Sequence, residues 1–142
     1  MHQIEIKYVG ELRSEAIHLQ SGERIINDAP TDNKGKGEAF SPTDLVVTAL
    51  GTCILTIMGI AAKQRGISIR GTRSEITKIM SKNPRRISKI IIHIYFSNNL
   101  SKQHKTILEK SALLCPVHNS LHPEIEKKII FHYPDLSGSN EI

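Results

Sequence analysis

Cys53 and Cys115 are the only two cysteines in the chain, and they are the residues best suited to chemistry. Cys53 lies inside an uncharged run at residues 45–62, where a thiol is ordinarily inert packing. Cys115 is followed by Pro116, where the chain must leave a helix, so it offers Cys53 a partner distant in sequence. Residues 1–7 lack the apolar segment of a secretory signal peptide. The pair therefore predicts redox or metal chemistry in a cytoplasmic protein rather than a structural disulfide.

The composition predicts a globular domain with neither nucleic acid nor membrane as partner. The chain has 142 residues, 23% charged and 39% hydrophobic, enough to build a core. Its net charge of +5 could attract nucleic acid, but the basic residues are scattered and there is no Trp to stack on bases. The run at 45–62 approaches the length of a membrane span, yet it contains glycines and threonines and lies between segments with strand periodicity.

Hydrophobic periodicity predicts strands on both sides of one long helix. The expected elements are strands at 3–9, 12–19 and 24–26, a loop at 28–40, a helix at 42–63, strands at 67–80 and 86–96, a helix at 101–113 capped by Ser101, a short turn, and a strand at 125–132. Residues 1–134 are expected to form a single domain, and residues 135–142 a flexible C-terminal tail.

The start of the long helix carries clear signals. Ser41 suits the N-cap, Pro42 suits the first helical position, and Asp44 stands three residues after the cap, as in a capping box. The helix is apolar on all sides, so we expect it to be covered on all sides. One sheet covers only one side, so a second helix or another subunit must cover the rest.

Two motifs resemble those of one protein family. Residues 41–53, SPTDLVVTALGTC, resemble the central-helix signature of the OsmC/Ohr family of cysteine-dependent peroxidases. Residues 115–121, CPVHNSL, resemble its second cysteine motif, and the order of elements matches over residues 1–132. The resemblance implies an α+β, OsmC-like fold, with antiparallel sheets wrapped around long central helices in an intertwined homodimer. Thr43 and His118 stand where the hydroperoxide-reductase branch has a glutamate and a serine, so the chain more closely resembles the general OsmC-like branch.

The resemblance also implies a reaction. Cys53 would attack an organic peroxide or hydrogen peroxide as a thiolate and become a sulfenic acid. Cys115 would condense with it to a transient disulfide, which an external thiol or lipoyl reductant would open. No bound cofactor is expected.

A cation is needed to stabilise the Cys53 thiolate. Cys53 lies eleven residues beyond Pro42, about 16 Å along the helix, where the helix dipole no longer helps. Arg13 is the first candidate, because it matches the family's active-site arginine, and Arg24 is the second.

A carboxylate could hold that guanidinium in place. Asp44 is one candidate, although it points away from Cys53 on the helix and the capping box already explains it. Glu38, in the preceding loop, is the other.

Two other classes of function stay open. Cys115, His118 and His122 have a Cys-x-x-His-x-x-x-His spacing plausible for zinc, which would need a fourth ligand such as Cys53. Alternatively, the chain is a thiol-bearing binding protein without turnover.

Overall fold

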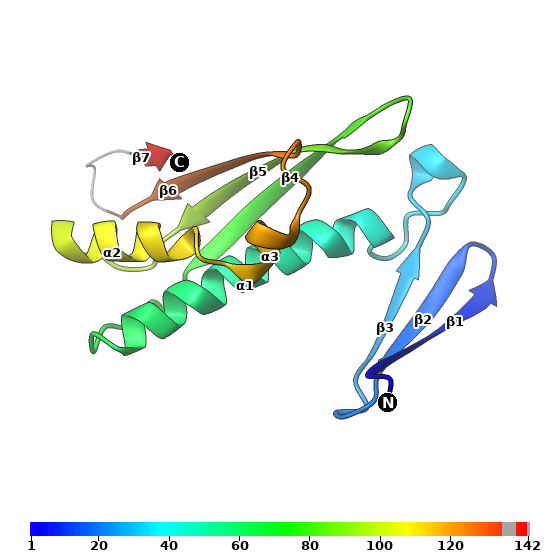
Figure 1. The fold of residues 1–142 in the computed structure, drawn as a ribbon, viewed down its shortest axis with the longest axis horizontal. Helices are drawn as coiled ribbons and strands as arrows, with labels where there is room; N and C mark the ends of the chain where they lie inside the picture. The colour runs from blue at the N-terminus through cyan, green and yellow to red at the C-terminus, as the bar shows by residue number, and fades with distance from the viewer. Residues whose placement is uncertain (135–138, 142) are drawn as a thin grey trace. The chain divides into compact units, whose positions relative to one another are not determined.

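The chain folds into two compact units, each with its own sheet. A computed structural model describes residues 1–134 and 139–141. The units are Met1–Val46 and Val47–Ile142, and the division falls inside the long helix α1, Pro42–Lys63 (Figure 1).

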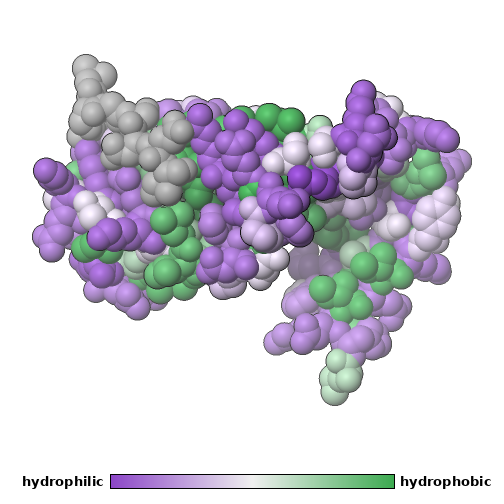
Figure 2. All heavy atoms as spheres, turned by 45° about the horizontal axis from the view of Figure 1, so that its top comes forward, coloured by the Kyte–Doolittle hydropathy of each residue, from purple (hydrophilic) through white to green (hydrophobic). Residues whose placement is uncertain are grey.

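The first unit is built on a three-stranded antiparallel sheet. Its strands are β1 (Ile4–Gly10), β2 (Arg13–His18) and β3 (Arg24–Asp28), in the order β1-β2-β3, followed by a 3-10 turn, η1 (Thr31–Asn33). The apolar residues of β1 alternate as predicted but remain exposed: Ile6 is 67% exposed and Tyr8 64%. Figure 2 shows hydrophobic side chains at the surface of this unit.

The second unit holds a four-stranded sheet in the order β4-β5-β6-β7. Its strands are β4 (Arg73–Ser81), β5 (Arg86–Tyr95), β6 (Glu126–His132) and β7 (Ser139–Glu141). β5 and β6 run parallel, so the prediction of purely antiparallel sheets is wrong for this pair. The reason is the long connection between them, which contains two helices and returns the chain to the starting end of β5.

The helices of the second unit lie on one face of this sheet (Figure 1). They are α1, α2 (Lys102–Ala112) and α3 (Pro116–Ser120). Inward-facing isoleucines of β5 alternate with outward residues, as the periodicity predicted. The fully buried core joins α1, α2 and the two central strands through these residues: Leu50, Ile54, Met58, Ile90, Ile92, Ile94, Leu108, Ile129 and Phe131.

Several predicted boundaries are corrected. β4 begins at Arg73 rather than residue 67, because the chain turns just before it, with Gly71 at a φ of +88°. The short turn predicted after Cys115 is the helix α3. Of the predicted flexible tail at 135–142, residues 135–138 and 142 lie outside the described residues, and residues 139–141 pair with β6 as β7.

The helix α1 buries one stripe and leaves another side open within the described chain. Its buried positions follow helical spacing, whereas Val46 is exposed and Ile60 is 50% exposed. By length and composition alone, α1 could cross a membrane. The core helix of a globular protein passes the same test, and α1 buries one stripe of its surface against the sheet, as such a helix does.

The predicted capping box at the start of α1 is confirmed. The Asp44 backbone N–H donates to Ser41 Oγ at 3.1 Å, and the Ser41 N–H donates to Asp44 Oδ2 at 2.9 Å. The predicted cap of α2 is confirmed as well, because Ser101 Oγ accepts from the His104 N–H. Both bonds satisfy backbone donors that a helix start leaves unpaired.

Replacing Asp44 by alanine is expected to destabilise the protein by about 1 kcal/mol, because the Ser41 N–H loses its acceptor. Urea unfolding at matched protein concentration measures this. Asp44→Glu restores a capping-box acceptor and is expected to recover most of the loss. An Asp44→Ala variant as stable as wild type would contradict the capping role.

Candidate functional site

Cys53 lies at the edge of the buried stripe of α1. Cys53 directly precedes Ile54, which is fully buried. The Cys53 side chain itself is half-buried and packs against the core. Two residues earlier, Gly51 allows α1 to approach β4, because a Cβ there would lie 2.3 Å from the terminal methyl of Ile76. The helix thus sets Cys53 at the boundary between core and surface.

Cys115 is held where α2 ends and α3 begins. It is fully buried and forms the N-cap of α3, with Pro116 at the first helical position. Its Sγ accepts a hydrogen bond from the backbone N–H of His118 at 3.4 Å. Pro116, which was predicted to break the preceding helix, therefore also begins α3. The junction of α2 and α3 fixes the position of the Cys115 thiol.

The structure brings the two cysteines together as free thiols. Cys53 and Cys115 lie near each other, and no disulfide joins them. Burial raises the pKa of the Cys115 thiol, and the interaction with Cys53 raises it further. The backbone N–H groups of Val117 and His118 act in the opposite direction. Because its pKa lies above the ordinary thiol value, Cys115 is a protonated thiol at neutral pH.

Arg13 lies in the first unit, on β2, opposite Asp28 of β3. Its Nε atom is buried and has no hydrogen-bond partner. Asp28 is only 1% exposed; its Oδ2 accepts from the Glu38 N–H at 3.0 Å, and its Oδ1 has no partner. A buried carboxylate is costly without a partner, so Asp28 is the carboxylate best placed beside Arg13. Sequence analysis missed it, because an aspartate at the border of a turn-rich loop looks like a turn residue.

The other predicted supporting residues have different surroundings. Arg24 forms an ion pair with Glu15 on the neighbouring strand. Glu38 is exposed, and it is its backbone N–H, not its carboxylate, that is bound to Asp28. Asp44 is engaged in the capping box.

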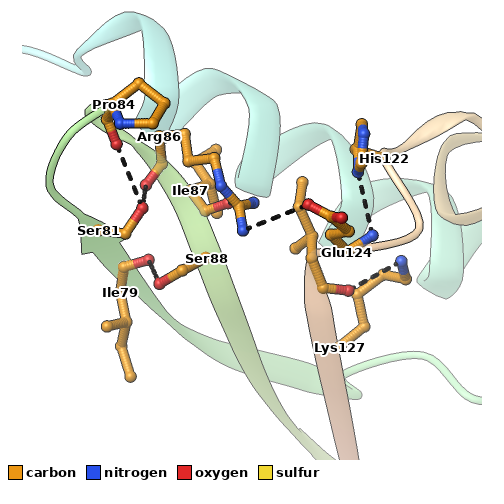
Figure 3. Close-up of polar contacts among 10 residues, drawn as sticks. Ile79, Ser81, Pro84, Arg86, Ile87, Ser88, His122, Glu124 and Lys127 are labelled. Carbon is orange, nitrogen blue, oxygen red and sulfur yellow. Dashed lines mark hydrogen bonds and ion pairs between the residues drawn. The ribbon is translucent and has the colours of Figure 1, made fainter.

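The predicted zinc ligands do not assemble. Within residues 1–134 and 139–141, no group of three or more His, Cys, Asp or Glu side chains is placed to hold a metal ion. The imidazole of His122 accepts from the Glu124 N–H in a local turn, and Glu124 also pairs with Arg86 at 4.0 Å (Figure 3). Burial and the charge of Lys127 lower the pKa of His118, so this histidine is neutral at pH 7.

Comparison with solved structures gives the fold independent support. A protein from Psychrobacter arcticus 273-4, described as a candidate osmotic stress induced and detoxification response protein, is 51% identical over 93% of this chain and 96% of its own, with a TM-score of 0.90. An organic hydroperoxide resistance protein OsmC from Legionella pneumophila is 14% identical, over 93% and 98% of the two chains, with a TM-score of 0.73. An OsmC like protein from Mycoplasma pneumoniae is 22% identical, over 94% and 95%, with a TM-score of 0.74.

The last two similarities concern the fold alone. A search of curated protein sequences found no match. The family model described as OsmC-like protein matches residues 35–129, a span that contains α1, the second sheet through most of β6, and both cysteines. The chain belongs to the OsmC-like protein family.

Proposed function

We propose that this protein is a thiol-dependent peroxidase that reduces organic peroxides or hydrogen peroxide with Cys53 and Cys115. The observation that carries the proposal is the neighbouring pair of free thiols, one half-buried and one fully buried. Solved relatives from Legionella pneumophila and Elizabethkingia anophelis are described as organic hydroperoxide resistance proteins, which supports the same class of substrate.

The half-buried thiol is the one that attacks. The Cys53 thiolate attacks one oxygen of the peroxide, so that an S–O bond forms, the O–O bond breaks and Cys53 becomes a sulfenic acid. The other oxygen leaves and is protonated to an alcohol or, from hydrogen peroxide, to water. Cys115 has a raised pKa and is shielded by burial, so it is the poorer nucleophile toward an incoming peroxide.

The buried thiol then resolves the intermediate. The Cys115 sulfur attacks the sulfenic sulfur, water leaves, and a Cys53–Cys115 disulfide forms. An external dithiol, of simple or lipoyl type, reduces this bond and is itself oxidised. Because the resting thiols are neighbours, we expect this step to need little rearrangement. In a cytoplasmic setting the reducing thiol pool would keep the pair open between turnovers.

Arg13 remains the proposed activating cation, on the strength of the family resemblance, and Asp28 is proposed to orient it. A guanidinium held by a carboxylate is a common arrangement for presenting a fixed positive charge. Arg24 is the weaker candidate, because Glu15 already neutralises it.

Replacing Cys53 by serine is expected to abolish peroxide consumption, since no thiolate remains to attack. Cys115→Ser is expected to retain the first turnover but to accumulate sulfinic acid on Cys53, because nothing resolves the sulfenic acid. Single-turnover assays with cumene hydroperoxide and hydrogen peroxide, followed by intact-mass measurement, test both variants.

Ser111→Ala is the matched control for loss of a small polar group on α2, and it is expected to consume peroxide at the wild-type rate. Wild-type turnover in Cys53→Ser would contradict the assignment of the attacking residue. A wild type that consumes no peroxide with any dithiol would favour the thiol-bearing binding protein instead.

We also propose that the protein is an obligate homodimer. Exposed apolar side chains on β1, among them Ile4, Ile6 and Tyr8, lie on one face of the first sheet. Large exposed apolar surfaces are typical of subunit interfaces. The open side of α1, including Ile60, adds to the apolar area that needs cover.

Sedimentation velocity at micromolar concentration is expected to show one dimeric species. Ile6→Asp places a charge within the apolar face of β1 and is expected to shift the population toward monomer or unfolded chain. Lys102→Asp, a charge change at the exposed start of α2, is the control and is expected to remain dimeric. A stably folded wild-type monomer at this concentration would contradict the proposal.

A further inference from the structure

The outer face of the second sheet carries a cluster of polar and aromatic side chains on the side away from the helices. This outer cluster consists of Arg73, Glu75, His93, Tyr95 and His132. The ring centroids of Tyr95 and His132 are 4.4 Å apart with planes at 10°, and those of His93 and His132 are 5.1 Å apart at 20°. Arg73 covers the other side of Tyr95, with its Cζ 4.2 Å from the ring centroid.

Strand register places these residues side by side. Tyr95 of β5 is opposite His132 of β6, and Glu75 of β4 is opposite His93 of β5. Successive residues of a strand point to opposite faces, so these positions face outward while Ile92, Ile94 and Phe131 face the core. The cluster is therefore a consequence of the parallel pairing of β5 with β6, which sequence analysis did not predict.

The two imidazoles face each other through ring nitrogens. His93 Nδ1 and His132 Nε2 are 2.8 Å apart. Two imidazole nitrogens bound to one metal ion at about 2.0–2.1 Å each lie about 2.8–3.0 Å apart at neighbouring positions of square-planar or octahedral geometry, and about 3.3–3.4 Å apart in tetrahedral geometry. The observed separation of 2.8 Å is close to the square-planar and octahedral value. Metal binding requires the proton between the nitrogens to move and the two rings to turn, so that both lone pairs point at the ion.

We propose that His93 and His132 form an exchangeable site for a late first-row divalent metal ion of the Ni²⁺, Cu²⁺ and Zn²⁺ class. In the metal-bound form, the proton that lies between the rings moves, and each ring is protonated on its outer nitrogen, His93 on Nε2 and His132 on Nδ1. Both facing nitrogens then offer a lone pair to the ion. Water completes the coordination, since within the described residues no third ligand side chain is in place.

The surroundings favour this occupant. Imidazole nitrogens prefer these ions over Mg²⁺ and Ca²⁺, which prefer oxygen.

Neighbouring residues support the two ligands. Glu75 is opposite His93 in the strand register, and in the proposed site its carboxylate would accept the outer imidazole N–H, the usual second partner of a metal-bound histidine. Its ion pair with Arg73 offsets the nearby positive charge, and stacking by Tyr95 fixes the plane of His132. The Arg73 and Glu75 side chains are 60% and 56% exposed, so the site opens to solvent.

The test is an NMR titration of the histidine ring protons with Ni²⁺, with Mg²⁺ as the comparison ion. The titrated protein is the full chain with Cys53→Ser, Cys115→Ser and His2→Gln, because thiolates and an N-terminal histidine bind nickel themselves. Paramagnetic broadening of the His93 and His132 signals at substoichiometric Ni²⁺, with none from Mg²⁺, is the expected result.

Equilibrium dialysis with Ni²⁺ supplies the second measurement. One bound equivalent is expected in the background protein and in the control His104→Gln, and its loss is expected in both His93→Gln and His132→Gln. Circular dichroism establishes that the variants are folded. Three outcomes would overturn the proposal: unselective broadening of all histidine signals, no broadening at millimolar Ni²⁺, or an unchanged bound equivalent in either site variant. The broadening experiment does not use the site variants, so its result holds even if a variant fails to fold.

Discussion

The packing of the α1 stripe on the inner face of the second sheet is the interaction on which the rest of the structure depends. Leu50, Ile54 and Met58 are fully buried against the isoleucines of β5. Fully burying side chains of this kind contributes about 1.5–3 kcal/mol each. The rotation of α1 is therefore fixed, and with it the half-buried position of Cys53. A rotation of one residue would either bury that thiol completely or expose it.

The same packing creates the chemical difference between the two thiols. Cys115 is drawn into the core at the junction of α2 and α3, where desolvation raises its pKa, while two backbone N–H groups oppose the rise. Cys53, one residue from the core stripe, keeps access to the surface. A fold that holds the two thiols close together, with only one of them partly exposed, suits a reaction in which one thiol attacks and the other resolves.

Sequence analysis predicted the parts of this arrangement that are encoded locally. The range of α1 agreed with residues 42–63, because its start has a capping box and Gly66, at a φ of +68°, follows its end. The direction of β6 could not be read in the same way, since it depends on how the connection after β5 crosses the sheet. The pairing of Cys53 with Cys115 was predicted from Pro116 after Cys115 and from the family resemblance, because the distance between two residues 62 apart in the sequence is a tertiary property. Asp28 was missed because burial of a loop-edge aspartate is a tertiary effect.

Mass mapping of the wild-type protein after one equivalent of cumene hydroperoxide is the most direct test of the central claim that Cys53 and Cys115 act as one redox pair. The account predicts a loss of two protons per chain, both cysteines blocked to alkylation, and a Cys53–Cys115 bridge within one subunit. This bridge should open again with a dithiol. Two freely alkylated thiols after peroxide exposure, or a bridge found only between subunits, would contradict it.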